Sequence, residues 1–249
     1  TYPWFFPERF GDRVSMTFKR WLTQGKNTYL LQTAENEGRY NGWDVAFNKS
    51  FSDEWSGSMS LGSENATPYG STTFEPYTSN TVGFSLAYDT RDNWMNPSKG
   101  QFYNMGIKRG WKYAASGQTN FTIYTAELNQ FVPIADKQVL AGHSSIGLGM
   151  GDVPIGEVFY AGGANTVRGY EPTQARIGTR RIVLNTEYRY TINDMFQAVI
   201  FFDWGNAWSA GWPDTYSFIS GIGFGLRLNT PMGPIRLDYG IGSNRSFSE

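Results

Sequence analysis

Apolar and polar residues alternate with a period of two along most of this 249-residue chain. Between Ile222 and Leu228, isoleucine, phenylalanine and two leucines share one face, while two glycines and an arginine share the other. Residues 81–89 and 235–241 alternate in the same way. Successive side chains of a β-strand point to opposite faces, so this period indicates strands. Helical periodicity is almost absent, and the pattern predicts an all-β chain.

The alternation predicts about eleven strands of about 9–14 residues each. A tilted strand needs about 9–11 residues to cross a bilayer, so each predicted strand is long enough to span a membrane. The predicted strands cover residues 12–21, 38–51, 54–66, 80–90, 101–112, 119–132, 137–150, 181–192, 196–208, 216–229 and 234–242.

The connections between the predicted strands differ in length. Short turns on one rim and long loops on the other are typical of outer-membrane β-barrels. The short connections are 52–53, 133–136, 193–194 and 230–233, and the long ones include 22–37, 67–79, 151–180 and 209–215.

Charged residues such as Glu127, Arg227 and Asp238 lie on the face opposite the apolar stripe. In a soluble barrel the apolar stripe would fill the interior, whereas in a membrane barrel it faces lipid and the polar face lines the lumen. Alternation alone fits both arrangements. Strand length and the unequal connections favour the membrane, so we predict a transmembrane antiparallel β-barrel.

The composition removes several other classes of protein. The mean hydropathy is −0.44, and no run approaches the roughly 18 apolar residues of a membrane helix. A barrel strand turns only every second residue to lipid, so low hydropathy is no argument against it. A net charge of −1 gives no electrostatic case for nucleic acid. The chain has no cysteine and one histidine, His143, so we expect no disulfide and no metal site.

The connection 151–180 contains a Gly-rich stretch with one arginine. The segment 159–163 (FYAGG), followed by Val167, Arg168, Gly169 and Tyr170, resembles the sixth-loop signature of the outer-membrane assembly factor superfamily, of the BamA and TamA type. Segments 89–100, 202–206 and 231–236 resemble further strand and turn motifs of that family.

The resemblance implies a 16-stranded barrel whose sixth loop is extracellular and folds into the lumen. On that register, residues 1–249 form one barrel domain that runs from the end of the fourth strand to the fifteenth. We therefore expect the first strands, the last strand and the periplasmic domains to lie outside this chain. An open sheet edge cannot face lipid, which leads to the same expectation.

The resemblance also implies that Arg168 pairs inside the lumen with Glu187 and Asp203. Alternation supports this, because both carboxylates are out of phase with the apolar residues of their strands. An arginine presents a planar fork of donors that suits carboxylates. The alternative is a solvated loop arginine.

A second candidate is the turn that contains Asp89, Arg91 and Asp92 before Pro97 and Gly100. The carboxylates could be acid and base groups, but we interpret them as caps that brace a tight periplasmic turn.

His143 and Ser145 are two residues apart on one face of a predicted strand. Barrel lipases use these residue types. By alternation, however, both point to the lumen, whereas a lipid-hydrolysing pair would face the membrane. We interpret His143 as structural.

From the resemblance we expect a non-enzymatic insertase, without a cofactor, that folds β-barrel proteins into the bacterial outer membrane. Its expected partners are membrane lipids, unfolded barrel clients, and accessory periplasmic or lipoprotein subunits. The alternatives are a TamA-like autotransporter assembly factor and a two-partner secretion pore. Client identity and the lateral seam are not encoded in these residues.

Overall fold

The structure, a computed structural model, describes residues 2–3, 14–26, 37–69, 74–171, 174–211, 213, 217–230 and 233–243. Over these residues the regular structure consists of β-strands and one 3-10 turn, η1 (Ile155–Glu157). The prediction of an all-β chain is confirmed. Within the same ranges, no helix is long and apolar enough to cross a membrane.

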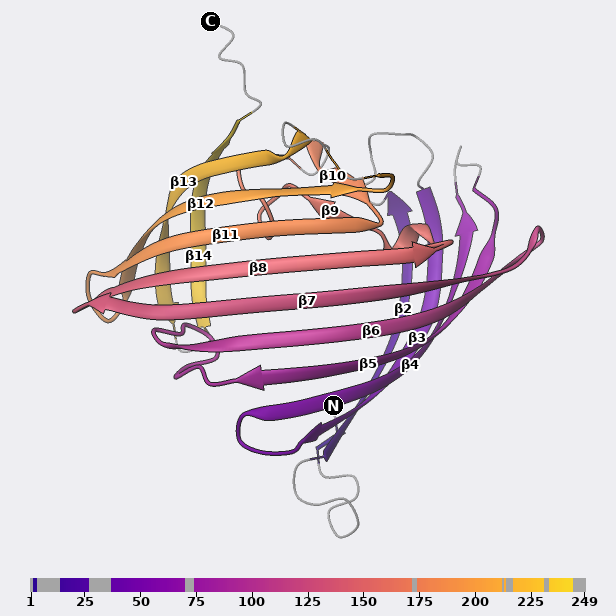
Figure 1. Ribbon diagram of the computed structural model, residues 1–249, viewed down its shortest axis with the longest axis horizontal. Helices are drawn as coiled ribbons and strands as arrows, with labels where there is room; N and C mark the ends of the chain where they lie inside the picture. The colour runs from indigo at the N-terminus through magenta and orange to yellow at the C-terminus, as the bar shows by residue number, and fades with distance from the viewer. Residues whose placement is uncertain are drawn as a thin grey trace, which may run out of the picture. The chain divides into compact units, whose positions relative to one another are not determined.

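Each predicted strand corresponds to one long strand, and the strands follow the chain from indigo to yellow in Figure 1. Predicted residues 12, 13 and 216 lie outside the described residues. The long strands are β2 (Val14–Lys26), β3 (Glu37–Ser50), β4 (Trp55–Pro68), β5 (Tyr77–Asp89), β6 (Gly100–Ala114), β7 (Gly117–Ala135), β8 (Gln138–Gly151), β11 (Arg180–Thr191), β12 (Phe196–Trp208), β13 (Ile219–Thr230) and β14 (Gly233–Gly242).

Strand order in the main sheet follows the sequence. A short β1 (Tyr2–Pro3) pairs with β2, and the order then runs through β8 to β11 and on to β14. The intervening β9 (Phe159–Ala161) and β10 (Arg176–Gly178) form their own antiparallel pair. Neighbours in sequence are thus neighbours in the sheet, as expected for strands joined by simple hairpins.

The prediction of a turn at 133–136 was wrong. Strand β7 continues through Pro133 to Ala135, and the turn consists of Asp136 and Lys137, with Lys137 at a φ of 59°. Proline marks turns because it fixes φ and removes a donor, but neither property prevents extended backbone near a strand end. A two-residue turn with positive φ is the usual way to close a hairpin.

The chain divides into two compact units. Unit 1 contains residues 1–88, 104–125 and 148–158, and unit 2 contains residues 89–103, 126–147 and 159–249. The expectation of a single barrel domain over 1–249 stays a prediction.

In unit 1, strands β2 to β5 pair with continuous antiparallel register. Phe47, Met59 and Phe84 lie directly opposite one another in three adjacent strands and are 42%, 40% and 53% exposed. The neighbouring row on the other face is polar: Asn48 lies opposite Ser58, which lies opposite Ser85. One face is therefore an open apolar surface and the other is polar.

In unit 2, strands β11 to β14 show the same division. The outward side chains remain exposed, for example Phe202 at 50%, Ile222 at 60% and Leu237 at 64%. The opposite face of β12 is buried, with Phe201 2% and Asp203 0% exposed. An apolar face of this extent is unfavourable in water and suits the hydrocarbon of a bilayer.

Candidate functional site

The candidate site is the Gly-rich segment between β9 and β10, which lies on the buried face of unit 2. A tight turn shapes it: the amide of Gly163 donates to the carbonyl of Val167 over 2.9 Å, and the amide of Thr166 donates back to Gly163 over 3.1 Å. The Thr166 hydroxyl accepts from the Gly162 amide at 2.8 Å. These bonds supply partners for a backbone that has no sheet ladder of its own.

Asp203 is the main partner of Arg168. The Nε of Arg168 donates to Oδ2 of Asp203 over 2.7 Å and Nη2 donates to Oδ1 over 2.8 Å, which makes a bidentate pair. The Arg168 backbone amide adds a third bond to Oδ2 at 3.0 Å. Arg168 is 5% and Asp203 0% exposed, so water does not compete for these bonds.

Glu187 and Asp238 accept from the remaining nitrogen of the fork. The Nη1 of Arg168 donates to Glu187 Oε1 over 2.7 Å and to Asp238 Oδ2 over 3.2 Å. The guanidinium carbon lies 3.5 Å from the centre of the Phe201 ring, so an aromatic face covers the plane of the fork. Three carboxylates and one ring therefore surround a single arginine.

Three more arginines complete the cluster. Arg189 donates to Glu187 over 2.8 Å, Arg227 bonds both Glu187 and Asp238, and Arg236 donates to Asp238 over 3.1 Å. The cluster thus holds four guanidinium groups, counting Arg168, and three carboxylates; Glu187 and Asp238 each contact three arginines, whereas Asp203 pairs with Arg168 and accepts from Asn185. Such pairing offsets the cost of removing charges from water.

Burial by itself would lower the pKa of Arg168. The hydrogen bonds and charge of Asp203, followed by the charge of Glu187, outweigh it and raise the pKa above the ordinary arginine value. Arg168 is therefore cationic at neutral pH.

Glycines on β13 and β14 leave room for the loop. A Cβ built on Gly221 would overlap the Arg168 carbonyl oxygen, and one built on Gly240 would lie 3.0 Å from the Gly169 amide nitrogen. Gly169 has a φ of 93°, which an L side chain would rarely adopt. The Tyr170 hydroxyl donates to the backbone carbonyl of Ser220, the residue before Gly221, at 3.0 Å.

A small apolar core supports the same loop. Val167 is fully buried, and it packs in a cluster with Ala161, Val183, Ala207 and Ile219, against which Tyr170 also rests. The loop therefore combines buried apolar contacts with buried ion pairs.

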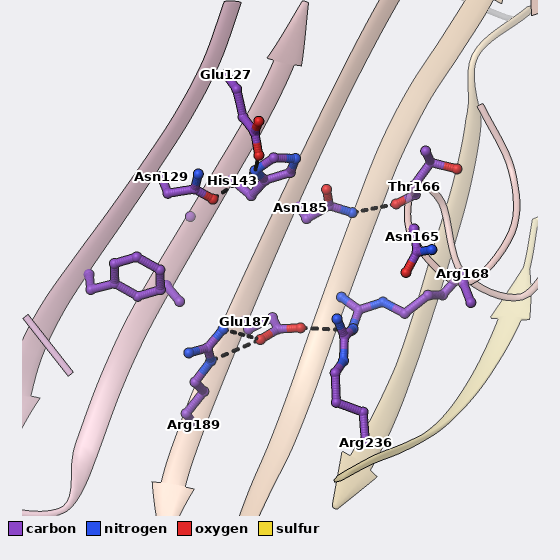
Figure 2. Close-up of a pocket in the computed structure, with 14 residues that line it drawn as sticks. Glu127, Asn129, His143, Asn165, Thr166, Arg168, Asn185, Glu187, Arg189 and Arg236 are labelled. Atoms are coloured by element: carbon purple, nitrogen blue, oxygen red, sulfur yellow. Dashed lines mark hydrogen bonds and ion pairs between the residues drawn. The ribbon is translucent and has the colours of Figure 1, made fainter. Parts of the chain in front are cut away.

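A cavity of 290 Å³ lies beside the arginine cluster in unit 2. Figure 2 shows the loop residues Asn165, Thr166 and Arg168 on one side of it and Glu127, Asn129 and His143 on the other. Glu187 reaches between Arg189 and Arg168 across the lower part of this view.

His143 and Ser145 do not form a catalytic pair. His143 Nδ1 lies 2.8 Å from the Asn129 side-chain oxygen, while the Ser145 hydroxyl accepts from Nη2 of Arg181 at 2.6 Å. Each side chain is committed to a different partner. Within the described residues, no group of three or more His, Asp or Glu side chains is arranged to hold a metal ion.

The turn between β5 and β6 is organised by its two aspartates. Arg91 donates to both carboxylate oxygens of Asp89, over 2.9 and 2.7 Å. Asp92 accepts from the Ser98 amide at 2.9 Å and the Lys99 amide at 3.2 Å. Burial alone would raise the pKa of Asp92, but the hydrogen bonds from Ser98, Lys99 and Asn93 lower it. Both carboxylates are thus occupied by turn contacts.

Gly100 and Pro97 complete this turn. Gly100 has a φ of 96°, and a Cβ there would overlap the Thr90 carbonyl, so glycine is required. Pro97 is buried between the cap and the start of β6.

Residues that sequence reasoning left out of the site are Asn185, Phe201, Asp238 and the three arginines of β11, β13 and β14. Asn185 donates to Asp203 over 2.7 Å and also to the Thr166 carbonyl. Alternation put these residues on the same face as Glu187 and Asp203, but it carried no information about which of them the loop would reach.

A sheet with one exposed apolar face and one polar face, on which a loop is docked by a buried arginine, fits the class of outer-membrane β-barrels. The chain belongs to the Omp85 superfamily: residues 1–246 match the Omp85 superfamily domain. It is an outer-membrane protein, as the fold and family together establish.

Two relatives are similar in sequence. The outer membrane protein assembly factor BamA of Nitratidesulfovibrio vulgaris is 30% identical over 173 residues, which is 61% of this chain and 22% of that protein. Outer envelope protein 80, chloroplastic, of Arabidopsis thaliana is 25% identical over 224 residues, 73% of this chain and 31% of that protein. The chain thus spans about a fifth to a third of the length of these two relatives.

The fold is similar to that of a solved outer-membrane barrel. The crystal structure of BamA from Haemophilus ducreyi lacking POTRA domains 1–3 superposes with a TM-score of 0.76 at 14% sequence identity, over 99% of this chain and 58% of that one. The predicted antiparallel barrel class and the family resemblance are confirmed.

Proposed function

We propose that this chain forms part of the barrel wall of an assembly factor that folds and inserts other β-barrel proteins into the bacterial outer membrane. The observation that carries the proposal is the buried arginine cluster, which holds the loop on the polar face of the sheet. A loop fastened by several buried charges obstructs the lumen instead of opening it. This arrangement suits a rigid wall better than a conduit for polypeptide.

In this proposal, Arg168, Glu187 and Asp203 fasten the loop, and Val167, Gly169 and Tyr170 shape it. The loop starts on the extracellular side, and the Asp89–Gly100 turn lies on the periplasmic side. Its proposed partners are outer-membrane lipids, unfolded barrel clients and accessory subunits. No cofactor or catalytic group enters the mechanism, because folding of the client supplies the free energy. An incoming strand would pair with an exposed sheet edge by β-augmentation.

Depletion of the full-length protein in its native host tests this function. We expect several unrelated outer-membrane barrels to lose their folded, heat-modifiable form together. Re-expression of the parent protein should restore them, and expression of the Arg168→Ala variant should restore them incompletely. The proposal is wrong if resident barrels stay folded after depletion while one secreted polypeptide is lost, which is the result expected of a secretion pore.

A further inference from the structure

The first part of the same loop lies on unit 1, before the Arg168 motif begins. Residues 152–158 belong to unit 1, together with the strand segments that they contact. Within residues 152–157, an acidic residue stands at each end, and a glycine directly precedes the second one.

Asp152 begins the stretch directly after β8. Its carboxylate accepts from Nζ of Lys112 and from the Thr119 hydroxyl, both over 2.8 Å. Its backbone amide donates to the Asn120 carbonyl at 3.1 Å. The bond from Lys112, followed by that from Thr119, lowers the pKa of Asp152, so the carboxylate is charged at neutral pH.

Glu157 ends the stretch in η1. Nζ of Lys108 lies 2.9 Å from each of its carboxylate oxygens, and the side chain of Glu157 is 26% exposed. Lys108 and Lys112 are four residues apart on β6, so they share one face of that strand. Met105 and Ile107, in the opposite phase, are 60% and 41% exposed. Both lysines thus project from the polar face of β6 and contact the loop.

Gly156 lets the backbone approach the sheet between these two pairs. A Cβ at Gly156 would lie 3.0 Å from Oε1 of Glu64 and 3.6 Å from the Tyr77 hydroxyl. Tyr77 is 6% exposed, and the Lys112 ammonium lies 5.5 Å from its ring centre. A larger residue at position 156 would meet the Glu64 carboxylate, so either that side chain or the stretch would have to shift.

We propose that residues 152–157 form a second, separate anchor of the loop, in which Lys108 and Lys112 are positioning residues for Glu157 and Asp152. The anchor itself is inferred from these contacts. Only its role in the assembly of other barrels rests on the proposed function. The anchor positions the start of the loop, whereas the Arg168 cluster fastens its middle.

Cysteine labelling tests the anchor directly, since the parent chain contains no cysteine and gives no background. Val153→Cys places a half-buried reporter between the two acidic residues. The maleimide reaction rate is measured on the full-length protein in outer-membrane preparations. We expect Lys108→Glu or Glu157→Lys to raise the rate about two- to fivefold, the range for losing a partly exposed ion pair.

The double variant Lys108→Glu with Glu157→Lys should return the rate to near the parent value, and Lys108→Arg should leave it unchanged. Glu54→Lys, which makes the same charge change at an exposed turn, is the matched control and should have no effect. If a reversal prevents folding, judged by heat-modifiable migration, Glu157→Gln replaces it with the same expected rise.

Two results would overturn the anchor: single reversals that behave like Glu54→Lys, or a double reversal that stays as reactive as the singles. A second reporter, Val167→Cys, should not respond to Lys108→Glu. A parallel rise there would show that one anchor holds the whole loop. None of these rates depends on client assembly, so failure of the anchor and failure of the proposed function are distinguishable.

Discussion

Gly221 lies directly against the carbonyl oxygen of Arg168, so closely that a single added carbon would overlap it. The bidentate bond between Arg168 and Asp203 therefore depends on opposite charge and also on the lack of a side chain at Gly221 in the neighbouring strand β13. Nothing in the spacing of Gly221 and Arg168, 53 residues apart in the chain, points to this contact.

Replacement of Gly221 by valine should displace the loop while the sheet stays intact. The added side chain occupies the space of the Arg168 carbonyl, which must move and pull the guanidinium off Asp203. We expect a lower temperature for loss of the heat-modifiable folded form, by the amount seen for Arg168→Ala or less. Gly142→Val is the control, because nothing lies within 4 Å of a Cβ there. Equal effects at both positions would contradict the role assigned to Gly221.

Removal of Arg168 should destabilise the barrel without changing its strand content. Arg168→Ala leaves Asp203 without its cation at 0% exposure, and loss of one partner of a buried pair costs about 3–5 kcal/mol. Urea-induced unfolding in lipid vesicles gives the free energy, and far-ultraviolet circular dichroism checks the strands. Arg236→Ala, whose side chain is 48% exposed, should cost much less. If both variants lost a similar amount of unfolding free energy, the stability of the cluster would not depend specifically on the buried Arg168.

Exchange of the charges of Arg168 and Asp203 should fail to restore stability. An aspartate at position 168 would face Glu187 and Asp238, which now contact Arg168 over 2.7 and 3.2 Å, so carboxylates would repel one another. The Lys108 and Glu157 exchange should succeed, because within the described residues each of the two has the other as its single ion-pair partner. Unfolding midpoints of the two exchanged variants provide the comparison. Full recovery in the Arg168 exchange would show that Asp203 alone determines the docking.

Asp92 should make the β5–β6 turn sensitive to acid. Its pKa is lower in the folded protein, so its contribution is present above the unfolded value of about 3.9 and is lost as pH falls through the folded value. Hydrogen exchange at the amides of Ser98 and Lys99 reports the cap. The parent should be better protected than Asp92→Asn at pH about 6, and the difference should be smaller at pH about 2. Equal protection at both pH values would exclude this role.

The strands and their two faces could be predicted from the sequence, because alternation with period two is a local property of each strand. The positions of Leu184, Ile200 and Phe224 predicted the outward face. Those of Glu187 and Asp203 predicted the inward face. The turn at 133–136 was placed incorrectly because proline indicates a turn but does not position it. The partners Asp238 and Arg227 were on the correct face, yet no local pattern could join residues 59 and 70 positions away from Arg168.

The Gly-rich segment with Arg168 indicated the family, and that resemblance implied two of the three carboxylate partners, which alternation placed on the inward face. Only the folded chain brought the third carboxylate, the Phe201 ring and the glycines of β13 and β14 around one guanidinium. The reason is physical: alternation depends on the backbone of one strand, whereas docking depends on register between strands and on the space that side chains leave. The same reason explains why Lys108 and Glu157, unremarkable in the sequence, meet in the structure.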